Sequence, residues 1–289
     1  MNVCAITDHG NMYGAYKFQS AMKAEGLKPI IGCEIYIAPR SMEDKEYGID
    51  NNYFHLVLLA KNLEGYKNLV KIVSIAHMDG FYYRPRIDIK TLKKHTGGLI
   101  ALSACLAGPV AQPLLNNDYK KAKENAELYS KLFKDNFYIE IQRNGMEEQN
   151  LVNESLIKIA KELDLLLVAT CDSHYLNRED AEIQEILWCI SDGTTMDDPN
   201  RRRMPTNEFY VKSSEQMQEL FSDLPEAVEN TQKIVEKIEE YDITFERVET
   251  KFLDLPKGET ARSYLKKLTY EGAKKKYGEI TKELKERID

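Results

Sequence analysis

The alternation of short apolar runs with amphipathic helical patterns limits the possible folds more than any other feature of this sequence. The apolar runs, each of strand length, cover residues 3–7, 28–37, 53–60, 98–103, 137–142 and 164–170. Helical patterns lie between several of these runs, near residues 11–25, 62–75, 118–133 and 150–163. Strands that alternate with helices usually form a parallel sheet covered by helices. We therefore predict an α/β fold with a mostly parallel sheet, open or closed.

Capping residues and spacing support the helices. Asn62 and Asp118 stand where helix N-caps are expected. After about residue 178 the pattern becomes mainly helical, and Pro225 is placed for the first turn of a helix. The segment 249–260 contains proline and glycine and resembles a linker. We expect a final helix that begins near Thr260 and still continues where the sequence ends.

Composition limits the possible functions. The net charge of −7 argues against broad nucleic-acid affinity, because phosphate neutralisation needs clustered Lys and Arg. The five cysteines lack CxxC spacing, which favours reduced thiols. No apolar run approaches the roughly 20 residues that span a bilayer, and no leader precedes the first run. We expect a soluble, cytoplasmic protein that does not enter a membrane.

Side chains of the metal-binding type occur at the ends of the predicted strands. They are Asp8, His9, Glu34, Cys105, Asp172 and His174. Polar residues at the carboxyl ends of parallel strands converge on one rim of an α/β barrel. His55 lies instead at the start of its run. Pairing of 28–37 with 53–60 as a hairpin would bring it beside Glu34.

The residue types suggest a chemistry. Imidazole, carboxylate and thiolate bind zinc, manganese or iron, and a mixed set suits two or three ions. Such a site would favour phosphoester hydrolysis. Each residue also has a structural alternative: His9 could lie on the surface beside an N-cap, Glu34 could form a salt bridge, Cys105 could be an inert buried thiol, and Asp172 to His174 could cap a helix near Arg178.

Other candidates are weaker. His77 and His95 lie in a region that reads as a loop, and we assign them surface or structural roles. Between them, "GFYYRPRIDIK" places aromatic residues beside Arg84 and Arg86. These arginines could contact phosphate or nucleic acid, or they could serve ordinary packing.

Several motifs together resemble a known family. They are "AITDHGNMYGA", "PIIGCEIYIAPR", "HLVLLAKN", "GFYYRPRID", "LIALSACLAG", "VATCDSHYL" and "LPKGETARSYL". In this order they are similar to the polymerase and histidinol phosphatase (PHP) domain of bacterial DNA polymerase III alpha subunits, of the uninterrupted DnaE type. The resemblance extends over essentially the whole chain.

The resemblance implies a distorted (β/α)7 barrel, like a TIM barrel, with up to three metal ions on its rim. It implies that His9, Glu34, His55, Cys105, Asp172 and His174 are ligands, and that Asp8 orients His9. The implied activity is a 3′–5′ exonuclease or related phosphoesterase. The implied partners are the rest of the alpha subunit, DNA and a separate proofreading exonuclease.

The sequence also departs from the family pattern. The His-x-His strand that opens the family's barrel would lie upstream of residue 3, so we expect a truncated barrel without its first strand and with weakened metal binding. The polymerase aspartates would lie beyond Asp289. We divide the chain into a barrel core at 1–180, a helical extension at 181–248, and a linker with the start of a polymerase palm at 249–289. Alternatives are a stand-alone phosphatase of the histidinol phosphatase type and a non-catalytic scaffold that docks a proofreading exonuclease.

Overall fold

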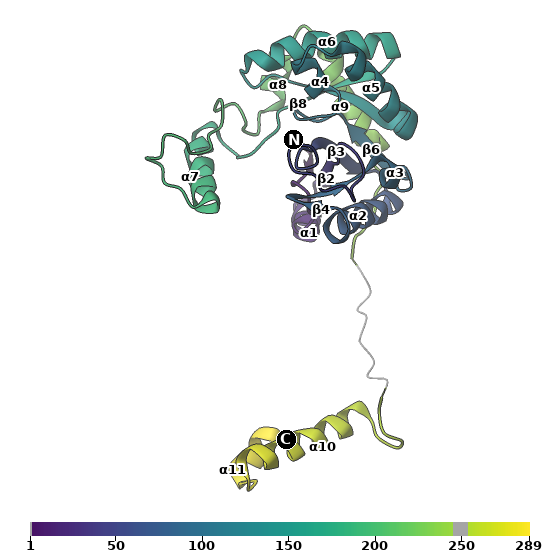
Figure 1. Cartoon of the computed structure of the whole chain (residues 1–289). Helices are drawn as coiled ribbons and strands as arrows, with labels where there is room; N and C mark the ends of the chain where they lie inside the picture. The colour runs from purple at the N-terminus through teal and green to yellow at the C-terminus, as the bar shows by residue number, and fades with distance from the viewer. Residues whose placement is uncertain (1, 245–253) are drawn as a thin grey trace. The chain divides into compact units, whose positions relative to one another are not determined.

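A computed structural model describes residues 2–244 and 254–289. Contacts divide the chain into two units, Met1–Ile243 and Thr244–Asp289. The first unit contains the described sheet and the helices that pack on it (Figure 1). It therefore joins the residues that we assigned to a barrel core with most of those assigned to a helical extension; the functional division into domains stays a prediction.

The described strands form one curled, mixed sheet. They are β1 (Val3–Ile6), β2 (Lys28–Ile37), β3 (Phe54–Ala60), β4 (Phe81–Tyr82), β5 (Arg84–Ile87), β6 (Leu99–Leu102), β7 (Phe137–Gln142) and β8 (Leu166–Thr170). Their order is β4-β5-β2-β3-β6-β7-β8, and β1 also pairs with β2. β3 runs antiparallel to both β2 and β6, whereas β1–β2, β2–β5, β6–β7 and β7–β8 are parallel. The prediction of a mostly parallel sheet was thus only partly right, because loop residues 38–53 join β2 to β3 as a hairpin.

Helices follow most of the strands. In the first unit they are α1 (Ala15–Ala24), α2 (Leu63–Met78), α3 (Ile89–Leu92), α4 (Ala111–Leu115), α5 (Tyr119–Phe133), α6 (Glu147–Leu163), α7 (Ala181–Asp192), α8 (Ser214–Leu220) and α9 (Pro225–Lys237), with 3-10 turns at Lys134–Asn136 and Arg178–Asp180. Both predicted N-caps are confirmed. The Asn62 side chain accepts a hydrogen bond from the Gly65 amide at 3.1 Å, and Asp118 accepts one from the Lys121 amide at 2.9 Å.

Alternation along the strands gives the sheet two different faces. The outer face carries a large apolar core that includes Ile31, Leu56 and Ile139, packed against helices α2, α5 and α6. The inner face carries a smaller apolar cluster that includes Val57 and Tyr138. Because side chains on a strand alternate between faces, the polar residues at even positions of β2 and β7 point to the inner face. The sheet therefore places its polar side chains opposite the helix-covered core.

The second unit contains α10 (Ala261–Tyr277) and α11 (Lys282–Ile288). α10 begins next to Thr260, as predicted, and Thr260 caps it by accepting a hydrogen bond from the Ser263 amide at 3.1 Å. The prediction of one helix running to the end of the sequence was wrong, because α10 stops at Gly278, whose φ of +78° is a left-handed conformation that glycine adopts easily. The first part of the predicted linker, residues 249–253, lies outside the described residues.

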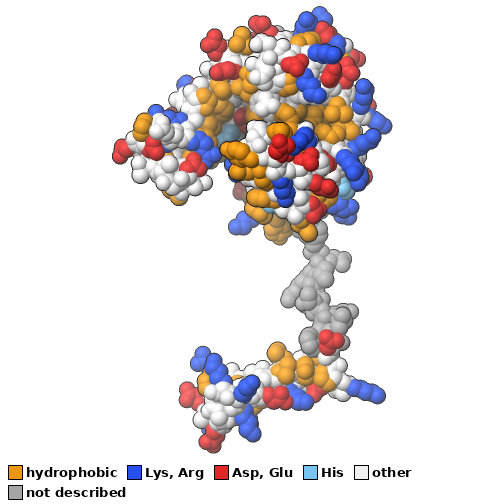
Figure 2. All heavy atoms as spheres, in the orientation of Figure 1, with side chains coloured by type: hydrophobic (Ala, Val, Ile, Leu, Met, Phe, Trp, Pro, Cys, Tyr) orange, Lys and Arg blue, Asp and Glu red, His pale blue; other side chains and the backbone are white. Residues whose placement is uncertain are grey.

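The surface of the first unit is mixed in charge. Figure 2 shows Lys and Arg side chains interspersed with Asp and Glu over its visible face. Among the described residues, we find no helix with the length and apolar character needed to cross a membrane.

Candidate metal centre

The turn after β1 places His9 beside β2. The parallel pairing of β1 with β2 continues past the end of β1 in the same register, so that His9 bridges to Glu34. The Glu34 amide donates to the Asp8 carbonyl at 3.0 Å, and the Gly10 amide donates to the Glu34 carbonyl at 2.8 Å. Gly10 has a φ of +66°, and a side chain there would come within 2.7 Å of the Tyr36 ring. Glycine is thus required where the chain turns away from the site.

The β2–β3 hairpin places His55 beside Glu34, as predicted. Residues that pair directly across the hairpin share a face of the sheet, and the pairs here are Glu34 with Val57 and Tyr36 with His55. Because β3 runs antiparallel, its first residues lie at the same rim as the last residues of the parallel strands. This reversal explains why a ligand-type residue occurs at the start of a strand.

His9, Glu34 and His55 offer three ligand atoms that lie within 4.8 Å of one another. The His9 Nδ1 atom is 3.1 Å from Glu34 Oε1, and His55 Nδ1 is close to the same oxygen. Glu34 Oε1 is buried and lacks a partner with hydrogen-bond geometry among the described residues. Buried polar atoms are rarely left without a partner, so this convergence of ligand atoms fits the binding of a divalent cation.

Electrostatics agree with this geometry. Burial alone would raise the pKa of Glu34, but the close approach of the His55 and His9 rings to its carboxylate outweighs burial and holds that pKa at about 2. Close contact with the Glu34 carboxylate raises the pKa of His9. The Glu34 carboxylate is therefore ionised at neutral pH, which is the form that binds metal.

Cys105 extends this group. Its Sγ atom lies 3.7 Å from His55 Nδ1, and Cys105 stands near the start of the loop that follows β6. Burial, with the charges of Asp172 and Glu34, raises the pKa of the Cys105 thiol well above its usual range. Without a cation the sulfur therefore stays protonated, and binding to a metal would require loss of that proton.

Asp172 and His174 reach the same region from β8. The rings of His174 and His9 are 5.7 Å apart. The His174 Nδ1–H group donates to the Asp172 carbonyl at 2.7 Å, which leaves the other ring nitrogen available as a lone-pair donor. Burial raises the pKa of Asp172. The structural alternative, in which Asp172 to His174 cap a helix near Arg178, is not seen, since Asn177 caps the Arg178–Asp180 turn.

Asp8, His77 and His95 lie outside the converging group. The negative charge of Asp8 adds to the rise in the pKa of His9, and its predicted role in orienting His9 stays a prediction. His77 belongs to α2 and not to a loop, and its Nε2–H group donates to the Gly10 carbonyl at 2.9 Å. This hydrogen bond supports the turn that carries His9. His95 lies just beyond α3.

The two arginines of "YRPR" differ in burial. Arg86 is completely buried, and its guanidinium donates to the backbone carbonyls of Gly80, Asp50, Met42 and Asp44. Arg86 therefore serves packing, and its predicted contact with phosphate is not supported. Arg84 is exposed.

Sequence reasoning missed three side chains of this region. Tyr36 packs against Tyr53 with ring centres 4.9 Å apart, and Tyr53 stacks on His55 at 5.8 Å. Glu140 of β7 is buried on the same inner face, where burial raises its pKa to about 7. A signal for Glu140 was available, because it is the one charged residue within the apolar run "FYIEIQ".

Comparison with known proteins agrees with this architecture. Residues 1–144 match the PHP domain family. This part of the chain is a PHP domain, as its motifs predicted. Its curated relatives include proteins named DNA polymerase III subunit alpha, from Borreliella burgdorferi (47% identical over 99% of this chain), Treponema pallidum (42% over 99%) and Thermus aquaticus (42% over 94%). The chain spans about a quarter of the length of these relatives, at 25%, 24% and 23%.

Proposed function

We propose that this chain provides the PHP phosphoesterase site of a DNA polymerase III alpha subunit, and that this site removes nucleotides from DNA 3′ ends with a divalent metal. One observation carries the proposal. Three ligand atoms of His9, Glu34 and His55 converge, and the buried Glu34 oxygen among them lacks a hydrogen-bond partner in the described part of the chain.

We assign the residues as follows. His9, Glu34 and His55 hold the first ion, and Cys105, Asp172 and His174 extend the set towards as many as three ions of zinc, manganese or iron. A bound ion of this kind polarises a phosphate ester and lowers the pKa of water, so that water can act as the nucleophile. Asp8 orients His9.

Arg84 is our proposed phosphate contact. The hydrogen bond with Tyr53 raises the pKa of Arg84, and Tyr53 stacks on His55, so the guanidinium lies one aromatic ring away from the candidate centre. Tyr83, the residue before Arg84, is 57% exposed and lies 6.4 Å from the ring of Tyr47. Exposed tyrosines beside one cation suit single-stranded DNA, whose bases stack on aromatic rings.

The remaining parts of the proposal concern context. The curled sheet forms part of a distorted (β/α)7 barrel in the cytoplasm. The rest of the alpha subunit, DNA and a proofreading exonuclease are its partners, and nucleotide transfer belongs to the parts of alpha subunits that this chain does not match. The identity to alpha subunits supports this assignment over a stand-alone phosphatase.

A matched pair of variants tests the proposal. Glu34→Gln removes the central ligand and preserves its shape, whereas Glu43→Gln changes an exposed carboxylate on the β2–β3 loop. Each protein is stripped of metal, supplied with Mn²⁺, and assayed for bound metal and for shortening of a 5′-labelled single strand. We expect Glu34→Gln to lose at least 100-fold in rate together with its metal, and Glu43→Gln to match the unaltered chain.

The assay also separates the alternatives. Metal-dependent hydrolysis of histidinol phosphate without any action on DNA would favour the stand-alone phosphatase. Metal binding without hydrolysis of either substrate would favour the scaffold. Equal activity and equal metal content in the Glu34→Gln variant would show that the metal centre is wrongly placed.

A further inference from the structure

We propose that Glu140 is a positioning residue that clamps together the two loops carrying Cys105 and Asp172. The inference rests on the proposed metal centre but concerns a residue that is not one of its ligands. Glu140 lies near the carboxyl end of β7, between β6 and β8. The loops after these two neighbours carry the two candidate ligands.

The Glu140 carboxylate contacts both neighbouring strands at their ends. Its Oε2 atom accepts a hydrogen bond at 3.0 Å from the amide of Ala104, which is the residue directly before Cys105. Its Oε1 atom accepts a hydrogen bond from the Thr170 hydroxyl, two residues before Asp172. One carboxylate therefore connects the starting points of both loops.

The conformations of the two loops explain why such a clamp is useful. Ala104 has a φ of +64° and Asp172 a φ of +47°, and both values lie in the left-handed region that non-glycine residues avoid. Backbone of this kind persists where its surroundings hold it. The hydrogen bonds from Ala104 and Thr170 to Glu140 provide such restraint close to each position.

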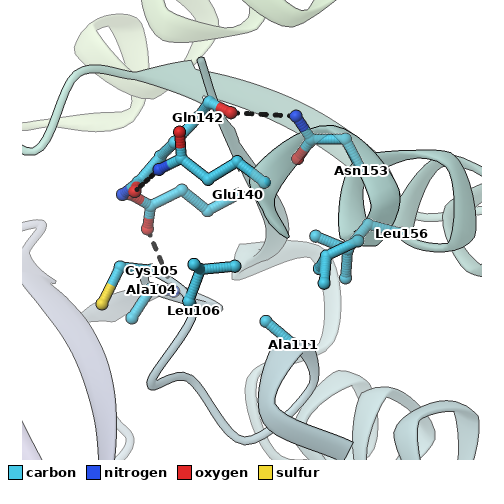
Figure 3. A pocket seen from close by; sticks show the side chains of 10 residues that line it. Ala104, Cys105, Leu106, Ala111, Glu140, Gln142, Asn153 and Leu156 are labelled. Atoms are coloured by element: carbon cyan, nitrogen blue, oxygen red, sulfur yellow. Dashed lines mark hydrogen bonds between the residues drawn. The ribbon is translucent and has the colours of Figure 1, made fainter. Parts of the chain in front are cut away.

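A buried polar network holds Glu140 in turn. The Gln142 amide group donates to Glu140 Oε1 at 3.0 Å, and the Gln149 amide group of α6 donates to the Gln142 side chain at 3.2 Å. Asn153, also on α6, donates to the Gln142 carbonyl at 2.9 Å. Figure 3 shows these side chains lining a small cavity, with the Cys105 sulfur pointing away from it.

The hydrogen-bond pattern requires two acceptor oxygens at this position. Three donors, from Ala104, Thr170 and Gln142, point at its two oxygens, and a carboxylate can accept all of them. An amide at this position offers only one acceptor oxygen and presents an NH₂ group to at least one donor. Glu140→Gln therefore preserves volume and breaks the clamp on one side.

Cobalt binding to the 289-residue chain tests the proposal. Co²⁺ bound to a thiolate gives a sulfur-to-cobalt charge-transfer band, which Cys105→Ser should abolish. We expect Glu140→Gln to lose at least half of this band and to bind Co²⁺ about tenfold more weakly, a typical effect of losing a group that orients a ligand. Amide hydrogen exchange at Ala104, measured without metal, should be at least tenfold faster in this variant.

Gln149→Ala is the matched control. Its side chain hydrogen-bonds to Gln142 and to the Asn144 amide, and all three hydrogen bonds to the Glu140 carboxylate remain when it is removed. We therefore expect a lower Tm with an unchanged cobalt band and unchanged exchange at Ala104. If Glu140→Gln does not fold, Thr170→Val gives the same readouts by removing the hydroxyl that donates to the carboxylate.

The outcomes are distinct. A folded Glu140→Gln variant with the cobalt band, the affinity and the exchange rate of the unaltered chain would overturn the clamp. If the unaltered chain itself binds no Co²⁺, the metal centre fails, and the exchange rate at Ala104 alone decides the clamp. Equal loss of the band in Gln149→Ala would reduce Glu140 to a general contributor to stability and would also overturn the proposal.

Discussion

Replacing each arginine of "YRPR" by methionine should separate a packing role from a substrate contact. Arg86 is completely buried and donates to four backbone carbonyls, two of them at 3.1 and 3.2 Å. Hydrogen bonds from charged donors contribute about 1.5–3 kcal/mol each, but they are not additive. Removal of the charge also relieves the desolvation cost of burying it. We therefore expect Arg86→Met to reduce the free energy of unfolding by about 3–5 kcal/mol.

Urea unfolding followed by circular dichroism measures this effect. For a unit of this size the loss corresponds to a decrease in Tm of roughly 10 °C. Arg84→Met, two residues away and exposed, should change the free energy of unfolding by less than about 0.5 kcal/mol. It should instead weaken binding of a single-stranded oligonucleotide about tenfold, as expected for one lost charge-assisted contact. A loss below 1 kcal/mol in Arg86→Met, or equal losses in both variants, would refute this reasoning.

Two further predictions concern the converging group without metal. The pKa of Glu34, about 2, lies below its ordinary 4.5, so its stabilising contribution is present above pH 4.5 and is lost as the pH falls towards 2. The pKa of His9 is raised above its ordinary 6.5, so its contribution is present below that pH and is lost as the pH rises through the raised pKa. The difference in unfolding free energy between the unaltered chain and Glu34→Gln should therefore peak between pH 4.5 and 6.5, and a difference constant with pH would contradict the ion pairing. Gly10→Ala should reduce the free energy of unfolding by at least about 1 kcal/mol more than Gly48→Ala in the same urea assay. Both glycines have positive φ, but only a side chain at Gly10 would clash, with Tyr36. Equal reductions would show that the clash is relieved.

Local pattern was sufficient to predict most of the strands. Residues 28–37 were predicted and observed with the same bounds, because the run is apolar and turns flank it. The hairpin with β3 was also correct, but its antiparallel pairing makes the sheet mixed, which the count of alternating strands and helices could not reveal. The break in the last helix was readable, since Gly278 and the N-cap Thr281 stand between α10 and α11.

The roles that the sequence could not predict depend on contacts with segments that are distant in the chain. The spacing of strand ends located His9 and Cys105, because carboxyl ends of parallel strands meet at one rim. Nothing local distinguishes Arg86 from Arg84, since the burial of Arg86 depends on carbonyls supplied by the β2–β3 loop and by Gly80. Glu140 carried a local signal as the one charged residue of its apolar run, but its role depends on Ala104 and Thr170, which lie on other segments of the chain.

The β2–β3 hairpin has a consequence for the order of folding. It joins Glu34 and His55 through contacts that are local in the chain, whereas β8 must close a much longer loop to bring Asp172 to the same rim. Loop closure costs more entropy as the loop lengthens, and distant pairings form slowly. Assembly of the rim can therefore begin with a two-ligand nucleus on a single hairpin, and the later strands complete a site whose centre already exists.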